Sequence, residues 1–206
     1  GRDIISLGAG EPDFDTPKHI IEAGKKALDD GLTRYTGVNG TPELQEAIIQ
    51  KFKRDNSLEF SPEEIHVSCG GKPVIFNAMM ATVNKGDEII IPAPYWVSYP
   101  EMAKLAGATP KFIFAGDDQG FKVSAAQIEE ALTPSTKLVI LNSPSNPTGC
   151  LYEKAEMEAI VELACRKNFL LMSDEIYEHL LYDGAEHHRP ASFSKEAAER
   201  VITVSG

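Results

Sequence analysis

Residues 137–149 read KLVILNSPSNPTG, an apolar run followed at once by a loop of Ser, Pro, Asn, Thr and Gly. The run is short enough to be a buried strand, of the kind found in parallel sheets that are covered on both faces. The loop then lies at the carboxyl end of a strand, which is the edge where open α/β sheets bind ligands. The same residue types also form ordinary turns, so this loop alone decides no function.

Helix and strand patterns alternate on both sides of this stretch, from about residue 16 to the end. Such alternation predicts an α/β domain with a largely parallel sheet. We expect strands at 65–68, 88–92, 110–114, 137–142, 169–173 and 201–204, and helices at 17–30, 42–56, 73–84, 124–132 and 153–167. Thr-Pro pairs at 16–17 and 41–42, and capping-box patterns at 61–64 and 124–127, predict helix starts. The helix at 42–56 is expected to turn four polar side chains to water: Gln45, Glu46, Lys51 and Lys53.

Composition and charge narrow the class of protein. The chain has 206 residues, 42% hydrophobic and 25% charged, which suits one large globular domain. Its formal charge of −11 argues against a nucleic-acid or anionic-membrane partner. Cys69, Cys150 and Cys165 lack CxxC spacing, so we expect no metal site, no disulfide framework and a cytoplasmic location. We see neither a signal peptide nor an apolar run near the roughly 20 residues that span a bilayer.

Three further loops on the same predicted sheet edge carry residues suited to a ligand. GGK at 70–72 precedes a helix; it can cradle a phosphate, or it can be only a tight connection. Asp174 follows the strand at 169–173, where its carboxylate can pair with a protonated ring nitrogen or cap a helix. Tyr177 is one helical turn further on. Trp96, the only tryptophan, can stack on an aromatic ligand or serve packing.

Six segments together resemble fold-type I pyridoxal 5′-phosphate (PLP) enzymes, specifically the bacterial aspartate/prephenate subgroup of the aspartate aminotransferase family. They are GAGEPDFDTP at 8–17, TRYTGVNGTPELQEAI at 33–48, GGK at 70–72, PYWVSYPEM at 94–102, NSPSNPTG at 142–149 and SDEIYEHLLYDG at 173–184. They follow one another in the family's order and spacing. The resemblance implies a three-layer α/β sandwich with a mostly parallel, mixed sheet flanked by helices. Residues 1–206 would be the large PLP-binding domain of such an enzyme without its C-terminal part, beginning with a leading segment at 1–15.

The resemblance also implies roles for individual residues. Asp174 and Tyr177 are the implied catalytic residues, and Gly10, Trp96 and Asn146 the implied substrate-binding residues. Cofactor binding is implied for Gly70, Gly71, Lys72, Trp96, Asn146, Asp174 and Tyr177, and for Tyr35 acting on the neighbouring subunit of a homodimer. A carboxylate beside the ring nitrogen would keep that nitrogen protonated, so that the ring can accept electrons from the substrate.

The match departs from the family at its most reactive residue. In relatives, the strand matching 201–204 leads into the lysine that forms the Schiff base with PLP. We expect that lysine, the downstream arginines and most of the small domain to be absent from residues 1–206. Neither Lys72 nor Lys137 is a good substitute, so these residues alone are expected to bind PLP or phosphate weakly and not to transaminate. Pro73 replaces the usual glutamine or alanine, and proline suits a helix start.

The implied activity is PLP-dependent transfer of an amino group between an amino acid, aspartate first, and a 2-oxo acid. Prephenate is a further candidate substrate. Two alternatives stay open: a fold-type I carbon–sulfur lyase, and a noncatalytic PLP- or phosphate-binding domain. A dinucleotide site is disfavoured because no GxGxxG follows the first strand. The resemblance further predicts a cis peptide at Asn146–Pro147, although only about 5% of X-Pro bonds are cis.

Overall fold

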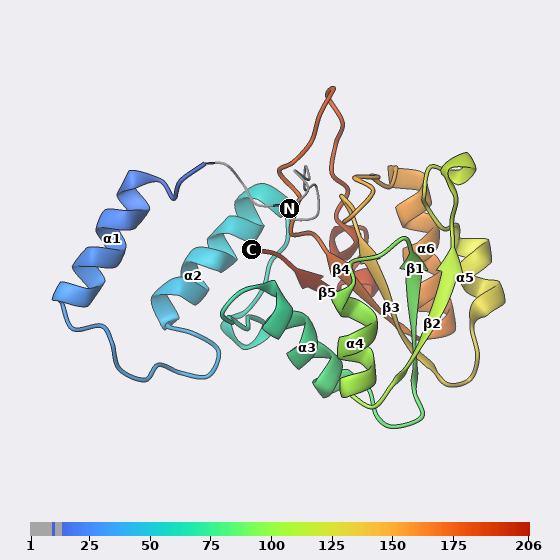
Figure 1. Ribbon diagram of the computed structural model, residues 1–206, viewed down its shortest axis with the longest axis horizontal. Coiled ribbons are helices and arrows are strands. Elements are labelled where there is room, and N and C mark those ends of the chain that lie inside the picture. Colours follow the sequence, from blue (N-terminus) through green and yellow to red (C-terminus); the bar gives the residue numbers. More distant parts are fainter. Residues whose placement is uncertain (1–9, 11–13) are drawn as a thin grey trace, which may run out of the picture. The chain divides into compact units, whose positions relative to one another are not determined.

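The computed structural model describes residue 10 and residues 14–206, which divide into two compact units (Figure 1). The first unit ends at Gly37 and contains helix α1 (Lys18–Asp29), which buries no side chain. Pro17 occupies the N-cap position of α1 without a side-chain hydrogen bond. The predicted threonine cap at residue 16 was therefore wrong, and the helix begins one residue later than expected.

The second unit, Val38–Gly206, contains a parallel sheet. Within the described residues the sheet has five strands in the order β2-β1-β3-β4-β5. Their bounds are β1 (Glu88–Ala93), β2 (Thr109–Phe114), β3 (Thr136–Asn142), β4 (Leu170–Asp174) and β5 (Val201–Val204). Asn142 pairs with Asp174, and Asp174 pairs with Val204. The carboxyl ends of β3, β4 and β5 are therefore level, and the loops that follow β3 and β4 start from one sheet edge.

Helices cover both faces of this sheet (Figure 1). One face carries α3 (Gly71–Thr82) and α4 (Ser98–Leu105); the other carries α5 (Ala125–Ala131), α6 (Lys154–Lys167) and α7 (Lys195–Ala198). Successive residues of β3 point to opposite faces, as strand geometry requires. Leu138 packs with α3 and α4, whereas Val139 packs with α5 and α6, and both are fully buried. The predicted three-layer α/β fold is confirmed, and the five strands are all parallel.

Helix α2 (Pro42–Lys51) continues as a π turn, Phe52–Asn56, and together they match the helix predicted at 42–56. The hydroxyl of Thr41 caps it by accepting from the Leu44 N–H at 3.3 Å. For two of the four side chains predicted to face water, the prediction was wrong. Gln45 is buried because its amide donates to the carbonyls of Pro62 and Ile65. Lys51 is largely shielded because its ammonium pairs with buried Glu178.

Three other features differ from the prediction or add to it. Residues 65–68 form no strand, and the N–H of Val67 donates instead to Asn39 O at 3.3 Å. An apolar segment becomes a strand only beside a ladder partner, and the described residues place none there. Helix α4 was not predicted, because Pro100 lies inside it. Short 3₁₀ turns also occur at Pro62–Glu64, Asp117–Gln119 and Pro190–Ser192.

The predicted cis peptide at Asn146–Pro147 is present, and Ala93–Pro94 and Ser143–Pro144 are also cis. The three cysteines lie in the described part of the chain, and all are free. Among the helices of residues 14–206, none combines the length and the apolar character that crossing a membrane requires.

Candidate active site

Asp174 ends strand β4 and is buried, with 4% of its surface exposed. Its Oδ2 accepts a 2.5 Å hydrogen bond from the Tyr99 hydroxyl, and its Oδ1 accepts from the Ile176 N–H at 3.3 Å. Burial raises the pKa of Asp174, and these two donors oppose that rise in part. The site therefore contains a shielded carboxyl group that suits a protonated nitrogen as its partner.

The loop after β3 is bonded directly to the end of β4. The Asn142 amide donates to Asp174 O at 2.9 Å, and the Ser143 N–H donates to the same oxygen at 3.2 Å. Asn142 Oδ1 in turn accepts from the Asn146 N–H at 2.6 Å. One side chain thus fixes the start of the loop and the position of Asn146 relative to Asp174.

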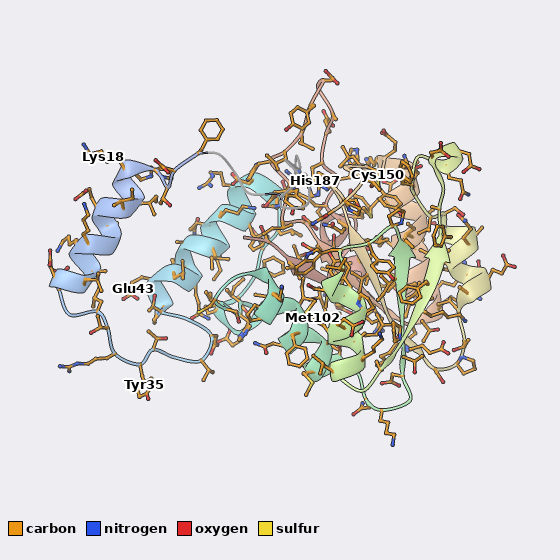
Figure 2. All side chains as sticks on the ribbon, in the orientation of Figure 1. Lys18, Tyr35, Glu43, Met102, Cys150 and His187 are labelled. Atoms are coloured by element: carbon orange, nitrogen blue, oxygen red, sulfur yellow. The ribbon has the colours of Figure 1, made fainter. Side chains whose placement is uncertain are left out.

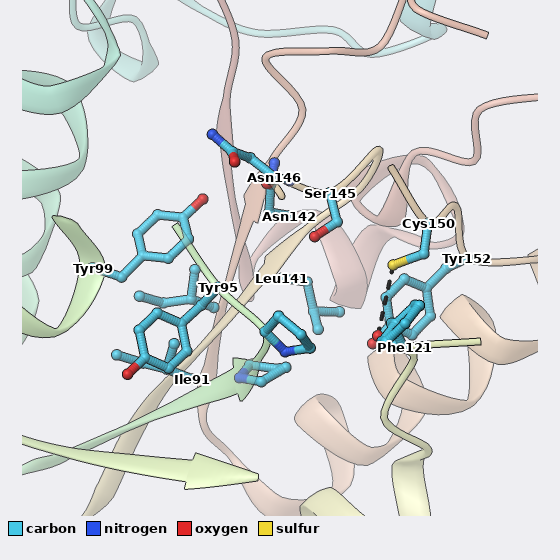
Figure 3. Close-up of a pocket in the computed structure, with 13 residues that line it drawn as sticks. Ile91, Tyr95, Tyr99, Phe121, Leu141, Asn142, Ser145, Asn146, Cys150 and Tyr152 are labelled. Carbon is cyan, nitrogen blue, oxygen red and sulfur yellow. Dashed lines mark hydrogen bonds between the residues drawn. The ribbon is translucent and has the colours of Figure 1, made fainter. Parts of the chain in front are cut away.

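A small cavity of about 20 Å³ lies beneath this loop and is lined by Tyr99, Asn142 and Asn146, among others. Figure 3 shows the Tyr99 hydroxyl pointing toward the two asparagines. The volume is enough for roughly one water molecule. A ring-sized ligand does not fit inside this cavity.

Trp96 and Tyr99 form the next part of the site, at the start of α4. Their rings meet edge to face, with centroids 5.4 Å apart and planes at 87°. Tyr99 is 2% exposed, and burial followed by the charge of Asp174 raises its pKa, so the phenol stays protonated and donates. Sequence reasoning missed Tyr99. The available signal was its position three residues after Trp96, which places both side chains on one side of a helical turn.

Gly70, Gly71 and Lys72 form the amino end of α3, which begins two residues before the predicted start at residue 73. Gly70 has φ 92° and ψ 169°, a region that is essentially restricted to glycine. The first N–H groups of a helix lack intrahelical partners and carry its positive dipole end. Lys72 is exposed, with its ammonium 5.2 Å from the centroid of the Trp96 ring. An anion at this helix end would meet both the N–H groups and the ammonium.

The structure brings the four predicted loops together. Contacts run from Lys72 to Trp96, from Trp96 to Tyr99, and from Tyr99 to Asp174. Asp174 then connects through Asn142 to the loop that holds Asn146. Residues as far apart in sequence as Lys72 and Asp174 thus form one continuous site at the carboxyl edge of the sheet.

The remaining predicted residues lie as follows. Tyr177 is half-buried in the turn that follows β4, where the Glu178 N–H donates to Glu175 O at 2.9 Å. Gly10 and Tyr35 belong to the first unit, and both are exposed. Figure 2 shows the Tyr35 side chain projecting from the loop after α1. The roles of these three residues stay predictions.

Comparison with known proteins assigns the family. Residues 2–206 match the family model of aminotransferase class I and II. The chain belongs to this aminotransferase family. An aspartate/prephenate aminotransferase from Cereibacter sphaeroides is 51% identical over 207 residues, covering 100% of this chain and 52% of that protein. An aspartate aminotransferase from Bacillus sp. strain YM-2 is 51% identical over 206 residues, covering 100% and 53%.

Solved aminotransferase structures have the same fold. The aspartate aminotransferase from Rhizobium meliloti superposes with a TM-score of 0.94 at 44% identity, over 97% of this chain and 50% of that one. The aromatic aminotransferase from Pyrococcus horikoshii gives 0.95 at 41% identity, over 99% and 54%. This aminotransferase chain therefore spans about half the length of the relatives it matches.

Proposed function

We propose that the full-length protein is a PLP-dependent aminotransferase that transfers an amino group between aspartate and a 2-oxo acid. The observation that supports this most directly is the buried Asp174 carboxyl group, bonded to Tyr99 and connected to the neighbouring loops. Membership of the aminotransferase family supports the reaction class. The names of two relatives at 51% identity support aspartate as the first substrate to test.

The chemistry of the site residues fits PLP. Its phosphate suits the Lys72 ammonium and the free N–H groups at the amino end of α3. Its pyridine ring suits the half-buried face of Trp96. The ring oxygen suits Asn146 and Tyr177, both of which are hydrogen-bond donors. A ring nitrogen that carries a proton suits Asp174.

When bound, PLP supplies an electron sink for the negative charge that develops at the α-carbon of the amino acid. The contribution of the chain is to hold groups in place around it. Asp174 would retain a proton at the ring nitrogen, because a shielded carboxylate strongly favours a neighbouring cation. Tyr99 would hold that carboxylate in one orientation, and Asn142 would keep the Asn146 loop beside it.

Subunit assembly and location form the second part of the proposal. The fully exposed phenol of Tyr35 supports a homodimer in which this residue contacts the phosphate site of the partner. Gly10 would line the substrate pocket. Three free cysteines are compatible with a reducing compartment such as the cytoplasm.

The decisive experiment is Asp174→Ala in the full-length protein, with turnover and PLP affinity measured separately. Aspartate and 2-oxoglutarate are the test substrates, with prephenate as a second acceptor. We expect turnover to fall about 100-fold or more and PLP affinity to fall much less, because the carboxylate acts mainly on charge formed in the transition state. Asp118→Ala, at an exposed position, is the matched control.

Two outcomes would contradict the proposal. One is near-normal turnover in Asp174→Ala with poor PLP retention. The other is a wild-type protein that cleaves a carbon–sulfur substrate while transferring no amino group from aspartate, which would favour the lyase alternative.

A further inference from the structure

A buried carboxyl–imidazole pair lies next to the candidate site and takes no part in the function described above. Glu175 follows Asp174 in the chain and is 1% exposed, and His187 is 5% exposed. Glu175 Oε2 and His187 Nδ1 are 3.9 Å apart, and neither atom has a hydrogen-bond partner among the described residues. Buried polar atoms are nearly always paired, so two unpaired atoms that face each other require an explanation.

The tautomer of His187 follows from its other nitrogen. Nε2 lies 3.0 Å from the carbonyl oxygen of Ser143, which can only accept, so Nε2 carries the hydrogen. Burial lowers the pKa of His187, and the bond to Ser143 opposes this in part, so the ring is neutral near pH 7. Nδ1 then presents a lone pair to Glu175. An ionised Glu175 would place a second lone pair against it.

Four titratable or charged groups surround the pair: Glu178, Lys51, Arg189 and His188. Glu178 already accepts from three donors, Lys51 and Ser205 at Oε1 and Asn56 at Oε2. Burial alone would raise the pKa of Glu178, but these donors bring it below its ordinary value. Glu178 is therefore the ionised carboxylate that balances the charge of Lys51.

Glu175 differs from Glu178 in its surroundings. Its only hydrogen-bond donor is the Ser173 hydroxyl, at Oε1, among the residues the structure describes. Burial raises the pKa of Glu175 to about 8, although Ser173 and the charge of Arg189 oppose the rise. The pKa values of the two glutamates are thus shifted in opposite directions. Hydrogen-bond donors favour the ionised form of Glu178, whereas burial favours the neutral form of Glu175.

We propose that Glu175 is protonated at neutral pH and shares that proton with Nδ1 of His187, which makes the pair a neutral hydrogen-bonded linkage. Closing the 3.9 Å separation to a normal hydrogen bond needs a side-chain shift of about 1 Å. The linkage runs from Glu175 through His187 to the carbonyl of Ser143, whose own N–H donates to Asp174 O. Glu175 and His187 are therefore positioning residues that hold the loops after β3 and β4 together.

The same three side chains, Glu175, Glu178 and His187, have potential ligand atoms within 4.8 Å of one another. The surrounding charges argue against a cation there. Lys51 and Arg189 already bring positive charge to this place, and both oxygens of Glu178 are bonded. A shared proton satisfies the two unpaired atoms and adds no charge.

The test compares Glu175→Gln with Glu178→Gln in the full-length protein, with thermal unfolding measured from pH 5 to 9 in buffer containing EDTA. The folded-state pKa of Glu175 lies above its unfolded value, so wild type loses stability as pH rises toward and through about 8. A glutamine amide donates to His187 without titrating. We expect the Tm of Glu175→Gln to lie within about 2 °C of wild type near pH 5, to exceed it increasingly as pH rises toward 8, and the difference to level off above about pH 8.

Glu178→Gln makes the same chemical change at the ionised neighbour and should lower Tm across this whole range. A Tm for Glu175→Gln that falls at pH 7 as far as that of Glu178→Gln would overturn the proposal. These measurements do not depend on catalysis, so they test the proton-sharing pair separately from the aminotransferase function. Only the role of the pair in positioning Asp174 rests on that proposed function.

A second measurement uses the unmodified protein. Nitrogen-15 NMR should show His187 as the neutral Nε2–H tautomer, with Nδ1 accepting a hydrogen bond, at pH 7. An imidazolium spectrum would show an ion pair and overturn the proposal. The proposal would also be overturned if Zn²⁺, added to the EDTA-treated and desalted protein, raised the Tm and the rise was complete at one equivalent of metal.

Discussion

At the scale of single residues, Asp174 depends on the hydroxyl of Tyr99. A buried carboxylate loses its hydration, and hydrogen bonds to the charged form compensate. Tyr99 is the side-chain donor to Asp174 within the described part of the chain, and the N–H of Ile176 is the backbone donor. Replacing one hydroxyl should therefore change the pH dependence of the whole domain.

Tyr99→Phe should lower the free energy of unfolding by about 1.5–3 kcal/mol at pH 8, since it leaves Asp174 Oδ2 without its donor. The loss should shrink as pH falls. The pKa of Asp174 is already raised in the folded state, so the stability it contributes is present at low pH and declines as pH rises; removing the donor enlarges that decline. Urea unfolding at pH 8 and pH 5 measures the difference.

Tyr95→Phe is the matched control for this experiment. Tyr95 is half-buried and stacks on Phe112 with ring centroids 5.0 Å apart, and its hydroxyl has no hydrogen bond within residues 14–206. Its substitution should change stability by less than about 0.5 kcal/mol. An equal loss at both pH values in Tyr99→Phe would show that its hydroxyl does not act through the charge of Asp174.

At the scale of elements, the amino end of α3 is built from two glycines with different tasks. Gly70 has φ 92° and ψ 169°, whereas the φ of Gly71 lies outside the left-handed region. A Cβ added at either residue would meet no atom within 4 Å. The two positions therefore differ in backbone conformation, and crowding plays no part in the comparison.

Gly70→Ala should destabilise the protein by about 1–3 kcal/mol, the cost of a side chain in a conformation that only glycine adopts readily. Gly71→Ala should leave the free energy of unfolding unchanged or raise it by up to about 1 kcal/mol, because alanine favours the helix. Thermal unfolding without phosphate measures these effects, and titration with inorganic phosphate then reports on the binding site. Equal losses of stability in the two variants would contradict this account of α3.

At the scale of the whole molecule, the two largest apolar clusters lie one on each face of the sheet, and we expect them to supply most of the stability. Leu138, fully buried, belongs to the cluster formed with α3 and α4. Leu138→Ala should cost about 2–5 kcal/mol, since it removes contacts and leaves a cavity that neighbours only partly fill.

Leu105→Ala provides the comparison, because Leu105 is 75% exposed at the end of α4. We expect it to change stability by less than about 0.5 kcal/mol. Chemical denaturation of both variants, with unchanged denaturant slopes, is the measurement. Similar losses in the two would mean that the buried clusters are not the main source of stability.

The sequence by itself determined the features that depend on neighbours along the chain. Ser124 and Gln127 form the predicted capping box, with backbone-to-side-chain distances of 2.9 and 3.2 Å, and the strands at 88–92 and 137–142 formed where their apolar runs indicated. The common edge of the loops after β1, β3 and β4 also followed, because parallel strands all end on the same side. The order and spacing of the six motifs then indicated the aminotransferase family.

Only the tertiary structure decided which distant side chains meet. Tyr99 bonds Asp174 across 75 residues, and Lys51 pairs with Glu178 across 127. The different environments of Glu175 and Glu178, three residues apart, arise in the same way. Residues 65–68 have the composition of a strand but no ladder partner beside them. Burial, ionisation and strand pairing depend on groups brought close by folding, and no local pattern contains that information.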